Sequence, residues 1–157
     1  YVTRVDFYSK YIVEELHKLM SNNDFQEIAQ SGGPYYPKVK YRDVAISWNQ
    51  SAKEIEALVR ACNPFPGALA YYRNMVLKVM ELELAPFAAG QPGEIMLIEG
   101  DLFISARDYY LKVNIIESPK EGIFSGKRFA SFCGIKSGEF FTELAQYLKQ
   151  EELDSHI

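Results

Sequence analysis

Apolar residues recur at steps of three and four in two parts of the chain, and this spacing predicts two amphipathic helices. In residues 7–20 the apolar positions are Tyr8, Tyr11, Ile12, Leu16 and Leu19. In residues 51–62 they are Ala52, Ile55, Leu58, Val59 and Cys62. Ser51 followed by Glu54 has the spacing of a capping box, which predicts where the second helix begins. Pro64 predicts its end, because proline disfavours a helical residue before it and has no N–H to donate.

From Leu69 onward the apolar pattern changes to a period of two, which predicts β-strands. Arg73 and Asn74 separate two alternating runs and predict a hairpin turn. Three more short runs follow, in residues 94–99, 102–106 and 109–117, so about five strands are expected. Short strands joined by tight turns, preceded by one helix, fit a small and partly open barrel of the OB type.

The remaining segments complete the predicted fold. Residues 24–45 show no sustained period and contain Gly32-Gly33-Pro34 and Pro37, so they are predicted to form a linker. Ser137 is the predicted N-cap of a last helix, whose apolar stripe is Phe140, Phe141, Leu144, Tyr147 and Leu148. The predicted fold is α+β: a small OB-like open β-barrel preceded by an amphipathic helix, with an N-terminal helix plus linker and a C-terminal helix.

Composition and charge narrow the class of protein. A chain of 157 residues that is 48% hydrophobic is long enough for one ordinary core or two small ones, and no apolar run approaches the roughly 20 residues of a membrane span. Cys62 and Cys133 lie far apart in apolar surroundings, which predicts reduced thiols and favours a cytoplasmic protein. The N-terminus shows no secretory signal pattern, and Tyr1 is expected to be a cut end.

The negative charge is concentrated at the C-terminus. Residues 139–157 carry five acidic residues against Lys149, which accounts for the whole formal net charge of -4. The rest of the chain is therefore balanced, so a local basic patch can still meet an anionic partner. Lys38, Lys40 and Arg42 are spaced two apart, and on an extended chain they would share one side, either as a basic ribbon or as an ordinary solvated face.

A search for catalytic groups finds little. His17 and His156 are the only histidines of the sequence, and neither lies near a pattern of cysteines or acids that would bind a metal. Residues 125–128, SGKR, lack the glycine-rich lead of a phosphate-binding loop. Glu81 and Glu83 are better explained as outward strand charges than as a glycosidase pair. The sequence therefore predicts no catalytic residue and no metal site in this chain.

Several motifs in order resemble those of a known family. They are ISWNQSAKEIEALVRACNPFPGA, then LKVMELE, PGEI and GDLFISARDYYLKV, with EIAQ and YYPKV upstream. Together they resemble the C-terminal domain of methionyl-tRNA formyltransferase and its relatives, including amino-sugar formyltransferases. The resemblance covers residues 24–138, and residues 8–20 are similar to the helix that closes the family's catalytic domain.

The resemblance implies a function for the parent protein. In this family an OB-like barrel follows a Rossmann-like domain that uses 10-formyltetrahydrofolate to formylate an amine, on an aminoacyl-tRNA or on a nucleotide amino sugar. The family's catalytic Asn, His and Asp have no counterpart here, and neither has its glycine-rich folate loop. The chain alone is therefore expected to be inactive and to bind no cofactor, with the folate and the chemistry belonging to an upstream catalytic domain.

The resemblance also implies an organisation and candidate contacts. Residues 1–23 would end the catalytic domain, 24–45 form a linker, 46–138 form the OB-like domain, and 139–157 form the C-terminal helix and acidic tail. The corner Asn63, Pro64, Phe65, Pro66 and Gly67 would face the other domain, although plain packing explains it equally well. The positions where an anionic substrate could be touched are Lys38, Lys40, Arg42 and Arg73. The acidic C-terminus and sparse basic face favour a small-molecule or nucleotide-sugar acceptor over tRNA.

Two other classes of function fit the same residues. The first is a stand-alone nucleic-acid-binding OB module, in which Tyr35, Tyr36, Tyr71 and Tyr72 would stack on bases beside lysine or arginine. The second is a structural domain that oligomerises, with a homodimer as the simplest case, through an exposed Phe129 and Phe132 or through the last helix.

Overall fold

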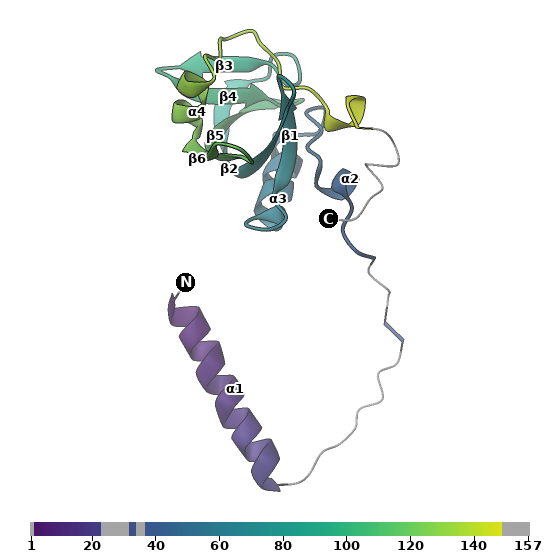
Figure 1. Cartoon of the computed structure of the whole chain (residues 1–157), viewed down its shortest axis with the longest axis vertical. Helices are drawn as coiled ribbons and strands as arrows, with labels where there is room; N and C mark the ends of the chain where they lie inside the picture. Colours follow the sequence, from purple (N-terminus) through teal and green to yellow (C-terminus); the bar gives the residue numbers. More distant parts are fainter. Residues whose placement is uncertain (1, 23–31, 34–36, 149–157) are drawn as a thin grey trace. The chain divides into compact units, whose positions relative to one another are not determined.

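The computed structural model describes residues 2–22, 32–33 and 37–148, which belong to two units, Tyr1–Tyr36 and Pro37–Ile157 (Figure 1). The first unit contains one long helix, α1 (Val2–Asn22). This confirms the predicted helix and extends it at both ends. The apolar stripe is exposed, with Tyr11, Ile12, Leu16, Leu19 and Met20 each more than 40% accessible. No helix among the described residues is long and apolar enough to span a membrane.

The second unit is built on one curled antiparallel sheet (Figure 1). Its strands pair in the order β1-β2-β5-β4-β3, and β6 pairs with β5. Their bounds are β1 (Ala68–Tyr72), β2 (Met75–Ala88), β3 (Ile95–Ile98), β4 (Asp101–Ser105), β5 (Tyr109–Ser118) and β6 (Gly122–Ser125). Irregularities in the register of β2 against β5 fall after Val79, Glu81 and Leu84, and such bulges bend a strand and increase its twist. The sheet therefore curls toward a barrel, as predicted.

The helix before the sheet, α3 (Ala52–Cys62), has the predicted boundaries to within one residue. Ser51 and Glu54 form the capping box: the Ser51 N–H donates to the Glu54 carboxylate at 2.8 Å, and the Ser51 hydroxyl accepts from the Glu54 N–H at 3.4 Å. The helix packs against β2 and buries its apolar stripe, including Ile55 and Val59. Its C-cap is Asn63, directly before Pro64, as the proline predicts.

The turn between β1 and β2 is the predicted two-residue hairpin. Arg73 and Asn74 both have positive φ, 44° and 64°, which matches the twist of the flanking strands. Two elements were not predicted from the sequence, β6 and the helix α4 (Gly126–Phe132) that follows it. Ser125 caps α4 by accepting from the Arg128 N–H at 3.3 Å, and the helix packs over β4 and β5.

The segment 24–45, predicted to be a linker, is only partly described by the structure. Within 24–45, residues 24–31 and 34–36 lie outside the described part of the chain, and α2 (Tyr41–Val44) is a single helical turn. The expected alternation of Lys38, Lys40 and Arg42 on one extended side is therefore wrong beyond Lys40. The reason is local: the Asp43 carboxylate accepts from the Lys40 N–H at 2.8 Å, which is the reciprocal contact of a helix start.

The prediction that Ser137 caps a last helix is wrong. The Ser137 hydroxyl instead accepts a hydrogen bond from the backbone N–H of Leu97 at 2.9 Å. After a turn at Ser137 and Gly138 the chain is extended as far as Thr142, and the helical part is one 3-10 turn, η1 (Leu144–Gln146). Residues 149–157, the rest of the predicted helix and tail, lie outside the described residues.

The extended segment 139–142, here called the strap, follows a turn at Gly138 and closes the open side of the sheet. On one side the Ile95 N–H donates to the Glu139 carbonyl at 2.8 Å, and the Phe141 N–H donates to the Gly93 carbonyl at 2.9 Å. On the other side the Thr142 N–H donates to the Tyr71 carbonyl at 3.0 Å. The strap thus pairs with both edge strands, β3 and β1, whose backbone groups would otherwise lack partners.

Candidate functional site

The basic segment 38–42 lies at the start of the second unit. Lys38 is exposed and Lys40 is half-buried, while the exposed Arg42 places its Nε 3.8 Å from the Asp43 carboxylate. Ala45, just past α2, bridges to Leu69 in β1, and this places the segment beside the edge of the sheet. The segment offers cationic side chains at the surface.

The corner between α3 and β1 presents an aromatic side chain to solvent. Phe65 is 76% exposed, and the bonds Asn63–Pro64 and Phe65–Pro66 are both cis. Gly67 is buried with φ +86°, a conformation that glycine adopts without strain, and its N–H donates to the Cys62 carbonyl at 2.9 Å. At this corner Gly67 is therefore fixed by a backbone hydrogen bond, while the Phe65 side chain is exposed to solvent.

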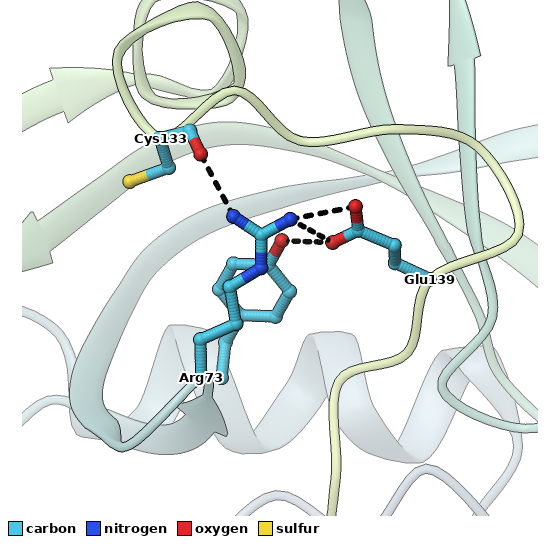
Figure 2. Close-up of polar contacts among 4 residues, drawn as sticks. Arg73, Cys133 and Glu139 are labelled. Atoms are coloured by element: carbon cyan, nitrogen blue, oxygen red, sulfur yellow. Dashed lines mark hydrogen bonds and ion pairs between the residues drawn. The ribbon is translucent and has the colours of Figure 1, made fainter.

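Arg73, the fourth predicted substrate contact, is held by groups of its own chain (Figure 2). One terminal nitrogen donates to both oxygens of Glu139 at 2.6 Å, and the other donates to the Cys133 carbonyl at 2.9 Å. The guanidinium lies 5.1 Å from the centre of the Tyr72 ring, and the Tyr72 hydroxyl donates to the same Glu139 carboxylate. Arg73 therefore anchors the strap to the β1–β2 turn.

The ionisation of this cluster follows from its contacts. The Tyr72 hydroxyl and the Arg73 guanidinium both donate to Glu139, and this lowers the pKa of the Glu139 carboxyl. Burial, and then the hydrogen bond to Glu139, raises the pKa of Tyr72. Glu139 is therefore ionised and Tyr72 neutral at neutral pH, so the cluster is a charge-assisted structural contact.

A cleft of about 480 Å³ lies beside the strap and is the main site that sequence reasoning missed. We call it the Trp48–Glu143 cleft, and its lining residues are Trp48, Asn49, Gln91, Pro92, Phe140, Phe141, Thr142, Glu143 and Gln146. Glu143 Oε1 accepts from the Ser47 hydroxyl at 2.7 Å and from the Asn49 side-chain amide at 3.0 Å. No signal in the sequence points to this site, because Glu143 falls in residues 139–157, which are predicted to form the C-terminal helix and acidic tail.

The structure also places the aromatic residues that were expected to bind nucleic acid or to mediate oligomerisation. Tyr72 is buried and Tyr71 stacks on Tyr147 at 3.8 Å, while Tyr35 and Tyr36 lie outside the described residues. The expectation that Phe129 is exposed is wrong: it is 1% accessible, because α4 turns it into the core. Phe132 is exposed as expected and stacks on Phe124 at 5.3 Å.

The described residues contain no group of three or more histidine, cysteine, aspartate or glutamate side chains that could hold a metal ion. Both cysteines are free thiols. Burial raises the pKa of both thiols, which leaves each a weaker nucleophile than an ordinary cysteine. Glu81 accepts a hydrogen bond from Asn114 on the neighbouring strand at 3.2 Å, as an outward strand charge does.

The family model and the relatives that match this chain point to the same family. Residues 38–133 match the model of the formyl transferase C-terminal domain. The chain is 30% identical over 104 residues to methionyl-tRNA formyltransferase of Thermodesulfovibrio yellowstonii, covering 66% of this chain and 33% of the relative. It is 25% identical over 150 residues to methionyl-tRNA formyltransferase of Thermotoga maritima, covering 94% of this chain and 46% of the relative. The chain thus spans less than half the length of these relatives.

The fold also occurs in a solved structure. HypX from Aquifex aeolicus, in complex with tetrahydrofolic acid, superposes with a TM-score of 0.66 at 19% identity. The superposition covers 83% of this chain and 26% of HypX. At this identity the likeness supports the arrangement of the elements alone.

Proposed function

Since the chain belongs to the formyl transferase C-terminal domain family, we propose that it is the non-catalytic substrate-recognition and scaffold domain of a folate-dependent formyltransferase. Residues 1–23 end the upstream catalytic domain, 24–45 form the linker, 46–138 form the OB-like domain, and 139–157 form the C-terminal part. The cofactor of the upstream domain is 10-formyltetrahydrofolate, and the whole enzyme formylates an amine.

The observation that carries this proposal is the exposed apolar stripe of α1. Tyr11 and Ile12 are more than half exposed in the middle of the helix, and Met20 is 77% exposed near its end. Large apolar surfaces on a helix of this length are normally covered by a packed partner. A catalytic domain that includes α1 supplies that partner. The exposed Phe65 at the corner is a second apolar contact for the same neighbour.

The first prediction tests whether formyl transfer and folate binding belong to the upstream catalytic domain. The 157-residue chain alone should show no transfer of formyl groups from 10-formyltetrahydrofolate to methionyl-tRNA, and no saturable binding of a folate analogue by calorimetry. The reason is that the family's catalytic Asn, His and Asp, which would carry the acid–base chemistry, and its glycine-rich folate loop have no counterpart among these residues. A methionyl-tRNA formyltransferase of the family serves as the active control. Turnover together with saturable folate binding by this chain would refute the proposal.

The acceptor that best fits the comparisons is an aminoacyl-tRNA, because the relatives matched by this chain are named for methionyl-tRNA. The preference for a nucleotide sugar, which rested on the acidic C-terminus, finds no support in those relatives. Lys38, Lys40 and Arg42 are the candidate phosphate contacts of the domain. Arg73 is a weaker candidate, because its guanidinium is already bound to Glu139 and Cys133. The exposed face around Phe132 is the candidate contact for a homodimer.

The second prediction concerns binding of tRNA. If segment 38–42 contacts phosphates, affinity should fall steeply with salt, because each neutralised phosphate releases counterions. Replacing Lys38, Lys40 and Arg42 together by alanine should flatten the slope of log affinity against log salt by about two to three units. Fluorescence anisotropy with labelled tRNA measures both slopes.

A matched control removes three exposed cations from elsewhere on the domain, namely Lys53, Arg60 and Lys136. This control should leave the salt slope closer to that of the parent chain. Equal slopes for the parent chain and the 38–42 variant would contradict a role of this segment in tRNA binding. A small nucleotide sugar would then be the favoured acceptor.

A further inference from the structure

The Trp48–Glu143 cleft has a fixed carboxylate with one oxygen available to a ligand. Glu143 Oε1 accepts two hydrogen bonds, from Ser47 and Asn49, and these hold the side chain in place. Its Oε2 has no hydrogen-bond donor among the described residues. A carboxylate oriented in this way accepts hydrogen bonds from a ligand without reorganisation.

Trp48 forms a buried part of the cleft wall. Its side chain is 1% exposed, and its indole N–H has no acceptor in the described part of the chain. That nitrogen has almost no accessible surface, so the polar contacts to a ligand come from Glu143 and the amides of the lining. Trp48 is itself held rigidly by an edge-on contact with Phe141, 5.8 Å between ring centres.

The remaining lining residues define the class of ligand. Asn49, Gln91 and Gln146 carry amides that both donate and accept, and Thr142 adds a hydroxyl. Phe140, 41% exposed, and Pro92 offer an apolar surface next to them. The lining holds one carboxylate and no lysine or arginine, which disfavours phosphate or any other anion.

We propose that the Trp48–Glu143 cleft binds the ring of a neutral sugar, a ribose or a hexose, with neighbouring hydroxyl groups donating to Glu143. Sugar hydroxyls donate and accept, as the amides and the carboxylate require, and the C–H face of the ring packs on Phe140. A volume of about 480 Å³ lies in the range of small-ligand sites and accommodates one such ring with its substituent. Only the source of the sugar rests on the proposed function: a nucleotide amino sugar supplies a hexose and a ribose with free 2′- and 3′-hydroxyls, whereas each ribose of an aminoacyl-tRNA has at least one of these two hydroxyls esterified.

The protein contains its own probe of this cleft, because Trp48 is the single tryptophan of the sequence. Titrations of the 157-residue chain followed by Trp48 fluorescence should show saturable changes with adenosine or with methyl glucoside. These two compounds distinguish a ribose from a hexose. 2′,3′-Dideoxyadenosine, which lacks the two neighbouring ribose hydroxyls, should not bind, and adenosine monophosphate should bind no more tightly than adenosine.

Variants then assign the binding to Glu143. Glu143→Gln should weaken the preferred sugar by about tenfold, because the acceptor loses its charge while its shape is kept. Gln91→Ala removes one amide of the lining and should weaken binding less. The control is Glu83→Gln, an exposed acid on β2 away from the cleft lining, which should change nothing. Thermal unfolding of each variant verifies that it is folded.

Each outcome decides the inference. Absence of a saturable response to both sugars at millimolar concentration, or equal binding of adenosine and dideoxyadenosine, overturns it. Tighter, salt-dependent binding of adenosine monophosphate overturns it as well, because it identifies an anion site. None of these results bears on formyl transfer by the whole enzyme, so failure of the sugar site and failure of the proposed function are distinguishable.

Discussion

Replacing Gly93 with alanine is expected to lower the free energy of unfolding by about 2–4 kcal/mol, because two independent costs combine at this position. Gly93 has φ +83°, a region that residues with a Cβ enter only with strain. A Cβ at this position would also clash with the backbone carbonyl oxygen of Phe141 in the strap. Backbone cannot move aside as the end of a side chain can, so the strap itself must shift.

Gly122→Ala is the matched control for this experiment. Gly122 has a similar φ, +98°, but a Cβ built there meets nothing within 4 Å. It should therefore show the backbone cost alone, about 1 kcal/mol. Denaturant unfolding of the parent and both variants gives the comparison. If the two alanine variants lose the same stability, the close approach of the strap to Gly93 has no energetic role.

The local parts of the fold were predictable from the sequence. The start of α3 follows from Ser51 and Glu54, and its end from Pro64, because capping and proline act within a few residues. The hairpin at Arg73 and Asn74 is likewise set by two residues and by the alternation of the strands beside them. These signals depend on neighbours in sequence, which a single chain displays directly.

The strap was not predictable in the same way. Phe140, Phe141 and Leu144 have the spacing of a helix face, yet the segment is extended because both edge strands of the sheet need backbone partners there. Phe141 then lies between Trp48 and Tyr72, at 5.8 Å and 4.9 Å between ring centres. Tertiary pairing and aromatic packing therefore override the local helical pattern.

The polar contacts of the candidate sites also depend on residues that are distant in sequence. Arg73 and Glu139 are 66 residues apart, and Glu143 reaches Ser47 across 96 residues. No periodicity or motif connects residues at such separations. The cationic positions Lys38, Lys40 and Arg42 were recognisable from spacing, whereas the intramolecular partner of Arg73 and the whole Trp48–Glu143 cleft required the folded chain.

Stability at low pH should depend on Glu139 in a way that the fold explains. Donation from Tyr72 and Arg73 lowers the pKa of Glu139 below its ordinary value of 4.5. A carboxyl with a lowered pKa in the folded state contributes stability that is fully present above the unfolded pKa. That contribution is lost as the pH falls through the folded pKa. The parent chain should therefore lose this stabilisation only at pH values below 4.5.

Glu139→Gln should lower the free energy of unfolding at neutral pH by roughly 1–2 kcal/mol, because the amide loses the ion pair while keeping one acceptor for Tyr72. The value is modest because the Arg73 side chain is 46% exposed, and solvent screens its charge. Denaturant unfolding from neutral to acidic pH should show the difference between parent and variant shrinking below pH 4.5. Glu83→Gln, exposed on β2, provides the baseline for losing one surface acid.

If the difference in free energy of unfolding between the parent chain and Glu139→Gln stays constant at acidic pH, the carboxylate charge does not hold the strap. The strap would then be fixed by its backbone pairing with Gly93, Ile95 and Tyr71 alone.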